Sequence, residues 1–170
     1  NHNEYDKEFL LHIDTFLIDC LTSLFLLDTS TFDQWVVDTT STKALCHQDY
    51  AAGNLAIGTD GNLYVYDMDS LTVDLPIRDI RKILNKVMKK ETWDLERMIV
   101  MIKAYQEVNP LTKEQYHVLA ADLLFPHLFY GQVTKYYDKR EDEWSFHKHL
   151  SRLQVMINTE ISKKQVVQAF

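Results

Sequence analysis

The segment His47-Gln48-Asp49-Tyr50-Ala51-Ala52-Gly53-Asn54 is the most informative stretch of the sequence. Apolar residues follow at 55–57 and 63–66, on either side of the Asp60-Gly61 pair, which favours a tight hairpin turn. Because a hairpin turns the chain back on itself, it predicts that Asp67 lies beside Asn54. Residues 55–66 are the one segment for which the sequence predicts β structure.

These residues form the pattern H-x-D-x-x-x-x-N followed by an aspartate at the end of a strand, which is typical of phosphoryl-transfer sites in kinases. The chemistry requires these side-chain types. A carboxylate has to meet the attacking hydroxyl group, and hard oxygen ligands have to hold magnesium against the nucleotide phosphates. Asp79 comes twelve residues after Asp67, at the expected start of the next helix.

Outside this stretch the sequence predicts helices. Its 170 residues include 4 glycines and 3 prolines, which are too few turn-forming residues for a sandwich or barrel of many short strands. Apolar residues recur at three- and four-residue spacing, as in helices with one buried face. The expected helices cover residues 9–27, 32–37, 77–87, 93–108, 112–124, 126–137 and 144–167, with a Thr/Ser-rich loop at 38–42. The expected fold is mainly α with a small β-hairpin, and 1–170 is expected to be a single domain because no repeat or linker interrupts it.

In the first helix an apolar stripe is expected to face the core, with acidic residues on the other side. The stripe consists of Phe9, Ile13, Phe16, Leu17, Cys20, Leu21 and Leu24. No run approaches the roughly 18 apolar residues of a membrane span, since polar residues interrupt 9–27, and no membrane partner is expected. No signal peptide is seen, and a chain that begins with Asn1 suggests a piece of a longer polypeptide.

The formal net charge of −7 is unevenly distributed. Residues 1–80 hold 14 acidic and 3 basic residues, whereas 81–170 hold 11 acidic and 15 basic ones. This balance argues against a nucleic-acid binder, which needs clustered Lys and Arg, and favours a cationic ligand such as an amine alcohol. Cys20 and Cys46 are too few for a disulfide framework or a metal-ligand set, and both are expected to be buried thiols.

The sequence resembles the aminoglycoside phosphotransferase-like kinases, and within them the bacterial spore-coat proteins of the CotS type. Segments 45–49, 53–54, 65–69 and 74–79 carry the resemblance, which continues more weakly at 125–129, 136–137 and Trp144. It covers nearly the whole chain, but its specific motifs lie between residues 45 and 79. It implies the C-terminal lobe of a protein-kinase-like α+β fold.

The resemblance also implies a role for each residue of the pattern. Asp49 would be the catalytic base that positions the substrate hydroxyl, and Asn54 and Asp67 would bind the Mg²⁺ that accompanies ATP. His47 and Asp79 would brace the loop through hydrogen bonds. The implied protein is an ATP-dependent phosphotransferase of the spore coat that transfers a γ-phosphoryl group to a hydroxyl acceptor, with other coat proteins as partners. The alternative is a structural coat component that uses the same fold without catalysis.

Some family features are absent from the sequence. Neither a glycine-rich phosphate loop nor a lysine on a strand precedes residue 47, so the nucleotide-clamping lobe is expected to lie outside this chain. Without that lobe, the helical lobe of this chain is expected to bind ATP poorly and to be inactive. Gln48 replaces the arginine of eukaryotic protein kinases, and Ala51 stands where Ser/Thr kinases carry a lysine. Between Asp69 and Pro76 there is no room for a long activation loop, which favours a kinase of small molecules without phosphorylation switching, or a protein that has kept the site for another purpose.

Other features have two interpretations. The basic residues Arg78, Arg81, Lys82, Lys86, Lys89 and Lys90 are interpreted as a solvated helix face rather than a phosphate site. Asp69 fits a turn better than a second metal site. His147 and His149 are expected at the surface, since residues two apart on a helix face different ways. The aromatic residues of 129–144 fit a helical core better than a cage for a quaternary amine.

Overall fold

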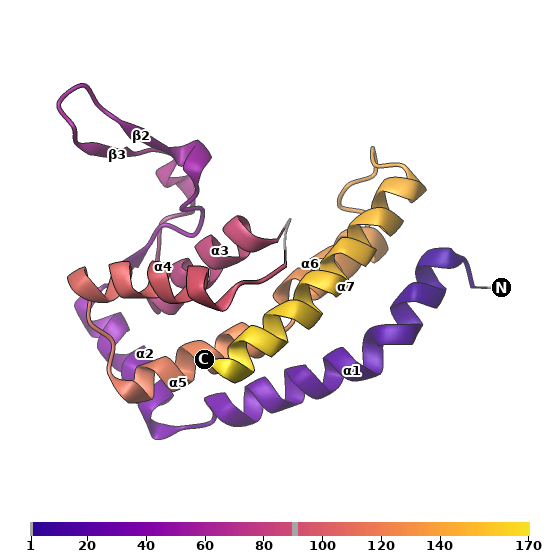
Figure 1. Ribbon diagram of the computed structural model, residues 1–170, viewed down its shortest axis with the longest axis horizontal. Coiled ribbons are helices and arrows are strands. Elements are labelled where there is room, and N and C mark those ends of the chain that lie inside the picture. Colours follow the sequence, from indigo (N-terminus) through magenta and orange to yellow (C-terminus); the bar gives the residue numbers. More distant parts are fainter. Residues whose placement is uncertain (1, 90–91) are drawn as a thin grey trace.

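The computed structural model describes residues 2–89 and 92–170 (Figure 1). In that part of the chain the α-helices are α1 (Glu4–Leu27), α2 (Ser30–Thr42), α3 (Ile77–Met88), α4 (Leu95–Val108), α5 (Lys113–Leu124), α6 (His127–Tyr137) and α7 (Phe146–Ala169). Two antiparallel sheets of two strands complete the fold: β1 (Leu45–Cys46) pairs with β4 (Thr72–Val73), and β2 (Leu55–Ile57) pairs with β3 (Leu63–Val65). The expected helical fold with a β-hairpin is confirmed.

Two expectations about local structure are wrong. Residues 38–42 form the last turn of α2 rather than a loop, and the hydroxyls of Thr40 and Thr42 are satisfied there by carbonyls one turn earlier in the same helix. The hairpin is also not the only sheet, since Leu45 of β1 lies opposite Val73 of β4. This second sheet closes a long loop, so the chain leaves and re-enters the helical body at one place.

Capping residues set several helix starts. At α5, Thr112 Oγ1 accepts from the Gln115 amide and Gln115 Oε1 accepts from the Thr112 amide. These two bonds form the capping box that the sequence predicts. Asn3 and Asp6 form the same arrangement at the start of α1.

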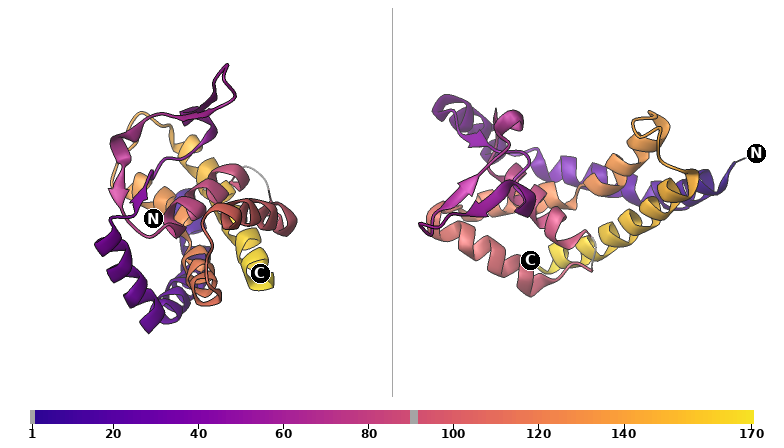
Figure 2. Two further views of the ribbon diagram at one scale, coloured as in Figure 1. Left: turned by 90° about the vertical axis from the view of Figure 1, so that its left-hand side faces the viewer. Right: turned by 90° about the horizontal axis from the view of Figure 1, so that it is seen from above.

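The apolar core has two parts. The larger part joins Trp35 of α2 to the inner faces of α3, α4 and α5, and reaches Val167 of α7. The smaller part lies between α1, α6 and α7 and is built around Tyr5, Phe16 and Phe129. Helix α1 packs along α5 and α7, whereas the β2–β3 hairpin projects away from the helices (Figures 1 and 2).

Helix α1 buries only part of the expected stripe: Phe16 lies in the smaller core, and Phe9 and Ile13 pack against it. Three members of the predicted stripe are exposed: Leu17, Leu21 and Leu24. Two polar residues lie in the interface instead, because each finds a partner there. Asp19 accepts from Lys164 Nζ (2.6 Å), and Ser23 donates to the carbonyl of Ala121 (2.7 Å).

The exposed apolar residues also change the expectation about membrane spans. Among the described residues, one helix, α1, is long and apolar enough by length and composition to cross a bilayer, and 17% of its apolar window is buried. The sequence-based statement that no run approaches a span is therefore corrected. Asp14 and Asp19 do not break the run, because two charges in such a window still leave its mean hydropathy high.

A buried ion pair within α7 contacts the connection between α5 and α6. Lys163 and Glu160 on α7 are 1% and 2% exposed, and their charged atoms lie 2.5 Å apart. Lys163 Nζ also donates to the carbonyl of Phe125 (3.0 Å), and Glu160 Oε1 accepts from the amide of Leu128 (2.7 Å). The pair thereby fixes the connection between α5 and α6 against α7.

Candidate active site

The loop of residues 47–54 begins at the end of β1 and ends in a turn of 3-10 helix that leads directly into β2. The amide of Tyr66 donates to the carbonyl of Asn54 (2.8 Å), which ties the returning strand to the end of the loop. Asp67 is the next residue and has a left-handed conformation (φ 59°). The hairpin therefore brings Asp67 back to Asn54, although the two are thirteen positions apart in the sequence.

His47 is buried and links both sides of this arrangement. Its Nδ1 accepts from the amide of Asp49 (3.2 Å), and its Nε2 contacts the carbonyl of Tyr66 (2.9 Å). Because Nδ1 accepts, Nε2 is the ring nitrogen available to donate to the Tyr66 carbonyl. The His47 ring thus connects Tyr66, which precedes Asp67, to Asp49, the proposed catalytic base.

Asp79, in the first turn of α3, holds the start of the loop. Its two carboxylate oxygens accept from the amides of His47 (2.6 Å) and Gln48 (2.7 Å). Gln48 is held at φ 67°, in a region that a residue with a Cβ rarely adopts. The two charge-assisted hydrogen bonds offset that strain, so Asp79 stabilises the bend that presents Asp49.

Asp49 is open to solvent and ionised. Asn54 Nδ2 donates to Asp49 Oδ2 (2.9 Å) and to the Asp49 carbonyl (2.9 Å), while Lys86 of α3 forms an ion pair with Oδ1. The hydrogen bond from Lys86 is the main cause that holds the pKa of Asp49 below its usual value. With 44% of its side chain exposed, the carboxylate can receive a hydrogen bond from an incoming hydroxyl.

Two lysines of α3 contact the loop, and the interpretation of the basic run as a solvated face is wrong for both. Lys86 pairs with Asp49, and Lys82 donates to the carbonyl of Gln48 (2.8 Å). Burial lowers the pKa of Lys82, with the neighbouring arginines adding to the effect. The spacing in the sequence could have indicated these contacts with the loop. Lys82 and Lys86 follow Asp79 by three and seven positions and so share its helix face. Lys90, another member of the run, lies outside the described residues.

The two arginines of the run are also paired. Arg78 forms an ion pair with Asp74 (2.6 Å), and buried Arg81 forms one with Asp122 of α5 (2.9 Å). Nε2 of His127 lies 2.8 Å from the guanidinium of Arg81 and 3.0 Å from the carbonyl of Asp122, and burial lowers the pKa of His127. These contacts fix α3, which carries Asp79 and both lysines, against α5 and α6.

The oxygen donors at the end of the loop fit a magnesium ion. Asn54 uses its amide nitrogen on Asp49, which leaves its amide oxygen for a cation, and exposed Asp67 follows Tyr66, whose amide bonds to the Asn54 carbonyl. Among the described residues, no three His, Cys, Asp or Glu side chains gather as a complete metal site. Mg²⁺ is commonly held by one or two protein oxygens together with substrate phosphates and waters, so this partial set suits it. Asp69 lies exposed in the following 3-10 turn, Met68–Ser70.

Cys46 precedes the loop but does not act as a nucleophile. It is buried, and its thiol lies 3.2 Å from the carbonyl of Asp74. Burial raises its pKa to about 11, with the nearby carboxylates of Asp79 and Asp74 adding to the shift. The thiol is therefore protonated at neutral pH. Cys20 is half-buried rather than buried.

A pocket of about 500 Å³ lies between α3 and α4 beside the loop. Its lining residues are Tyr50, Asp79, Ile80, Ile83, Leu84, Met101, Ala104 and Tyr105. Most of this lining is apolar, and both carboxylate oxygens of Asp79 are engaged by the loop. The pocket therefore suits the apolar part of a small molecule.

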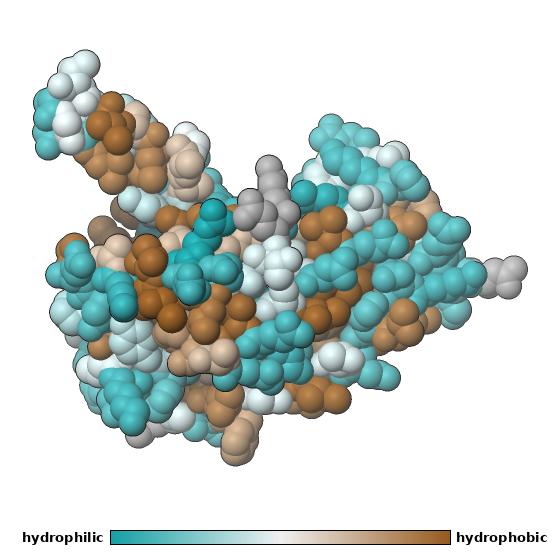
Figure 3. All heavy atoms as spheres, in the orientation of Figure 1, coloured by the Kyte–Doolittle hydropathy of each residue, from teal (hydrophilic) through white to brown (hydrophobic). Residues whose placement is uncertain are grey.

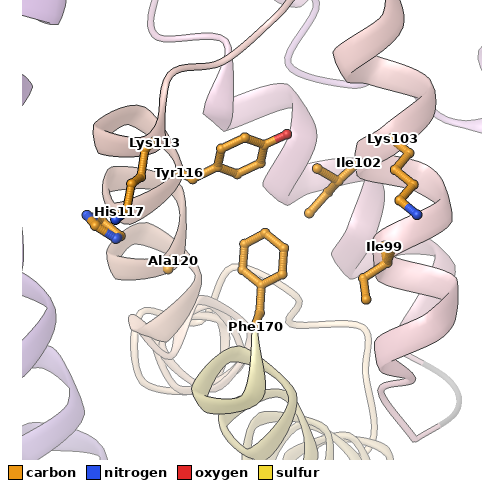
Figure 4. Close-up of a pocket in the computed structure, with 8 residues that line it drawn as sticks. All are labelled: Ile99, Ile102, Lys103, Lys113, Tyr116, His117, Ala120 and Phe170. Atoms are coloured by element: carbon orange, nitrogen blue, oxygen red, sulfur yellow. The ribbon is translucent and has the colours of Figure 1, made fainter.

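A second pocket, of about 420 Å³, lies between α4 and α5 and is bounded by Phe170 (Figure 4). Ile99, Ile102 and Phe170 form its apolar part, with Lys103 and Lys113 at its sides. No residue of the 47–54 loop lines it, so it is separate from the candidate site.

Three aromatic residues near the end of α6, Tyr136, Tyr137 and Trp144, line a pocket of about 740 Å³, but cations of the chain itself lie over the Trp144 ring. Lys148 Nζ lies 4.0 Å from the centre of the Trp144 ring, and Lys135 Nζ lies 5.3 Å from it. At the Trp144 ring, the chain's own cations therefore occupy the position that a quaternary amine would take. His149 is buried against Gln132 and the carbonyl of Glu141, which corrects its expected surface position.

Comparison with known proteins identifies the family. The family model described as "Spore coat putative kinase YutH" matches residues 24–170. The chain belongs to this family. Spore coat protein S of Bacillus subtilis (strain 168) is 40% identical over 160 residues, which cover 94% of this chain and 45% of that protein. The chain thus spans less than half the length of this relative.

A solved structure supports the fold. The aminoglycoside phosphotransferase from Alicyclobacillus acidocaldarius matches with a TM-score of 0.85 over 99% of this chain and 50% of that one, at 17% sequence identity. At this identity the match shows the fold alone. The resemblance stated from sequence motifs is confirmed: this is a kinase-like protein of the spore coat with an aminoglycoside phosphotransferase-like fold.

Proposed function

We propose that the chain is the catalytic lobe of an ATP-dependent phosphotransferase that acts in the spore coat and phosphorylates a hydroxyl group of a small molecule. One observation carries the proposal: Asn54 donates to the carboxylate of Asp49, and the hairpin returns the chain so that Tyr66, the residue before Asp67, bonds to the Asn54 carbonyl. A decayed site would be expected to have lost at least one of Asp49, Asn54 and Asp67.

In the proposed reaction Asp49 orients the acceptor. Its ionised carboxylate accepts a hydrogen bond from the hydroxyl and receives the proton as the new phosphate ester bond forms. A strongly basic carboxylate is not required, because the transition state is loose and little proton transfer precedes bond formation. The lowered pKa of Asp49 therefore suits a residue that mainly orients the acceptor.

Asn54 and Asp67 would hold Mg²⁺ through the Asn54 amide oxygen and the Asp67 carboxylate. The ion, when bound, neutralises charge on the phosphates of ATP. His47 and Asp79 are proposed to hold the catalytic loop in place, since their hydrogen bonds fix Gln48, Asp49 and the strand that leads to Asp67. Their role is to position the loop, because neither is proposed to touch the reacting atoms.

A nucleotide-clamping lobe outside this chain is part of the proposal. Apolar side chains gather on the projecting hairpin (Figure 3), where Ile57, Leu63 and Tyr64 are exposed, and Leu45 and Met68 are exposed close to it in the sequence. Exposed apolar surface of this kind indicates a surface that another part of a protein covers. The relatives, which are about twice as long, have the residues to supply it.

The acceptor is proposed to be a small alcohol with some apolar surface. The pocket beside Tyr50 is large enough for such a group and adjoins Asp49 in the sequence. Its apolar lining favours this class over the cationic acceptor that the charge distribution alone suggested. Other coat proteins are proposed as partners of the whole protein, in keeping with the names of its relatives.

The test is a phosphoryl-transfer assay on the full-length protein. ADP release and transfer from γ-labelled ATP would be measured with a panel of alcohols, with and without Mg²⁺. We expect transfer that needs both Mg²⁺ and an acceptor. Absence of transfer to every acceptor, together with absence of Mg-ADP binding in a calorimeter, would favour the structural coat component instead.

A further inference from the structure

Lys86 has no role in the reaction described so far, although it contacts the residue at its centre. It reaches Asp49 from α3, and the only partner described for its ammonium group is this carboxylate. The contact is accessible, since 32% of the Lys86 side chain and 44% of that of Asp49 are exposed. A substrate that approaches Asp49 therefore approaches Lys86 as well.

The chemistry of the two groups suggests what Lys86 can do. An ammonium group carries three hydrogen-bond donors, and Asp49 engages one of them. Because 32% of the Lys86 side chain is exposed, the other two are open to a ligand that approaches Asp49, such as the highly charged phosphates of a nucleotide. Cationic clamps on a transferring phosphoryl group are a recurrent source of transition-state stabilisation.

The loop itself offers no such cation. Its side chains are neutral or acidic, with Ala51 at the position where Ser/Thr kinases carry a lysine. Lys82, the other lysine that contacts the loop, already donates to the carbonyl of Gln48 and is partly desolvated. Lys86 is thus the better placed of the two for a second anion.

We propose that Lys86 contacts the γ-phosphoryl group of ATP and holds it next to Asp49. In the step, the bond between the γ-phosphorus and the oxygen that bridges it to ADP breaks, and a bond from that phosphorus to the acceptor oxygen forms. The acceptor proton passes to Asp49, and Lys86 keeps its own proton throughout. This inference rests on the proposed phosphotransferase function and adds a residue that recognises the third phosphate.

The experiment compares two nucleotides by calorimetry on the full-length protein in the presence of Mg²⁺: ADP and a non-hydrolysable ATP analogue. The Lys86→Met variant should lose about 10-fold or more of its preference for the triphosphate over ADP, because a charge-assisted contact is removed from one ligand and not from the other. Lys86→Arg should retain part of the preference. Lys135→Met, which removes the same charge far from the loop in the sequence, should leave the preference unchanged.

The possible failures are distinguishable. If Lys86→Met binds both nucleotides with the wild-type ratio, or weakens both equally while its circular dichroism spectrum is unchanged, Lys86 does not read the γ-phosphate and this inference is wrong. If the wild-type protein binds neither nucleotide with Mg²⁺, the proposed function fails first and the role of Lys86 fails with it.

Discussion

Asp49→Asn is expected to lower kcat for phosphoryl transfer by about 100-fold or more in the full-length protein, with a much smaller effect on the Kd for Mg-ATP. An amide keeps the shape of the carboxylate but cannot accept the proton of the acceptor, and a positioned general base contributes roughly 10²- to 10⁴-fold. The nucleotide would still be held by the Asn54 and Asp67 oxygens. Initial rates of ADP release at saturating ATP measure the effect.

The matched control for this substitution is Asp14→Asn. Asp14 is an exposed aspartate on α1, so its substitution removes the same charge without changing the loop of residues 47–54. Its kcat should equal that of the wild type. Equal rates for Asp49→Asn and the wild type would show that Asp49 is not the base.

Lys163→Met is expected to lower the free energy of unfolding by about 3 to 5 kcal/mol, because it leaves the carboxylate of Glu160 buried without its counter-ion. The effect should be large because both side chains are almost completely buried and connect α7 to the α5–α6 junction. Urea denaturation followed by circular dichroism measures it.

Two further variants separate the buried charge from a general sensitivity to substitution. Replacing both residues by Met should recover much of the loss, since the cost of an unpaired buried charge disappears. Arg140→Met breaks an exposed ion pair with Asp138 and should cost less than about 1 kcal/mol. If Lys163→Met lowers the free energy of unfolding by no more than Arg140→Met does, the buried ion pair does not have the structural role described.

Local signals predicted most of the fold. The Asp60-Gly61 turn located the hairpin, and the Thr112 capping box located the start of α5, because both depend on neighbours in the sequence. The β1–β4 sheet could not be predicted in the same way, since its strands have two residues each and are separated by 25 residues. The complete buried face of α1 could not be predicted from the sequence either. Apolar residues surround much of this helix, and its buried face depends on partners such as Lys164 and Ala121, which are distant in the sequence.

The candidate site shows the same division. The pattern of His47, Asp49, Asn54 and Asp67 was visible because the loop and hairpin are contiguous in the sequence. The cations around it were missed, because a basic run on a helix looks solvated until the tertiary fold presents one face to the loop. Lys86 illustrates this best, since its position on the face of Asp79 could be read from spacing, but its contact with Asp49 could not.

The most direct test of a magnesium-dependent phosphotransferase site is the calorimetric Kd of the full-length protein for ATP with and without Mg²⁺, measured for the wild type and for Asp67→Asn. The wild type should bind ATP more tightly with Mg²⁺. In Asp67→Asn the Mg²⁺-dependent gain in affinity for ATP should fall by roughly 10-fold or more. Loss of even an outer-sphere partner weakens metal binding by about 10- to 100-fold. Binding of ATP that is equally tight with and without Mg²⁺, or a Mg²⁺ gain that survives Asp67→Asn unchanged, would contradict the proposed site.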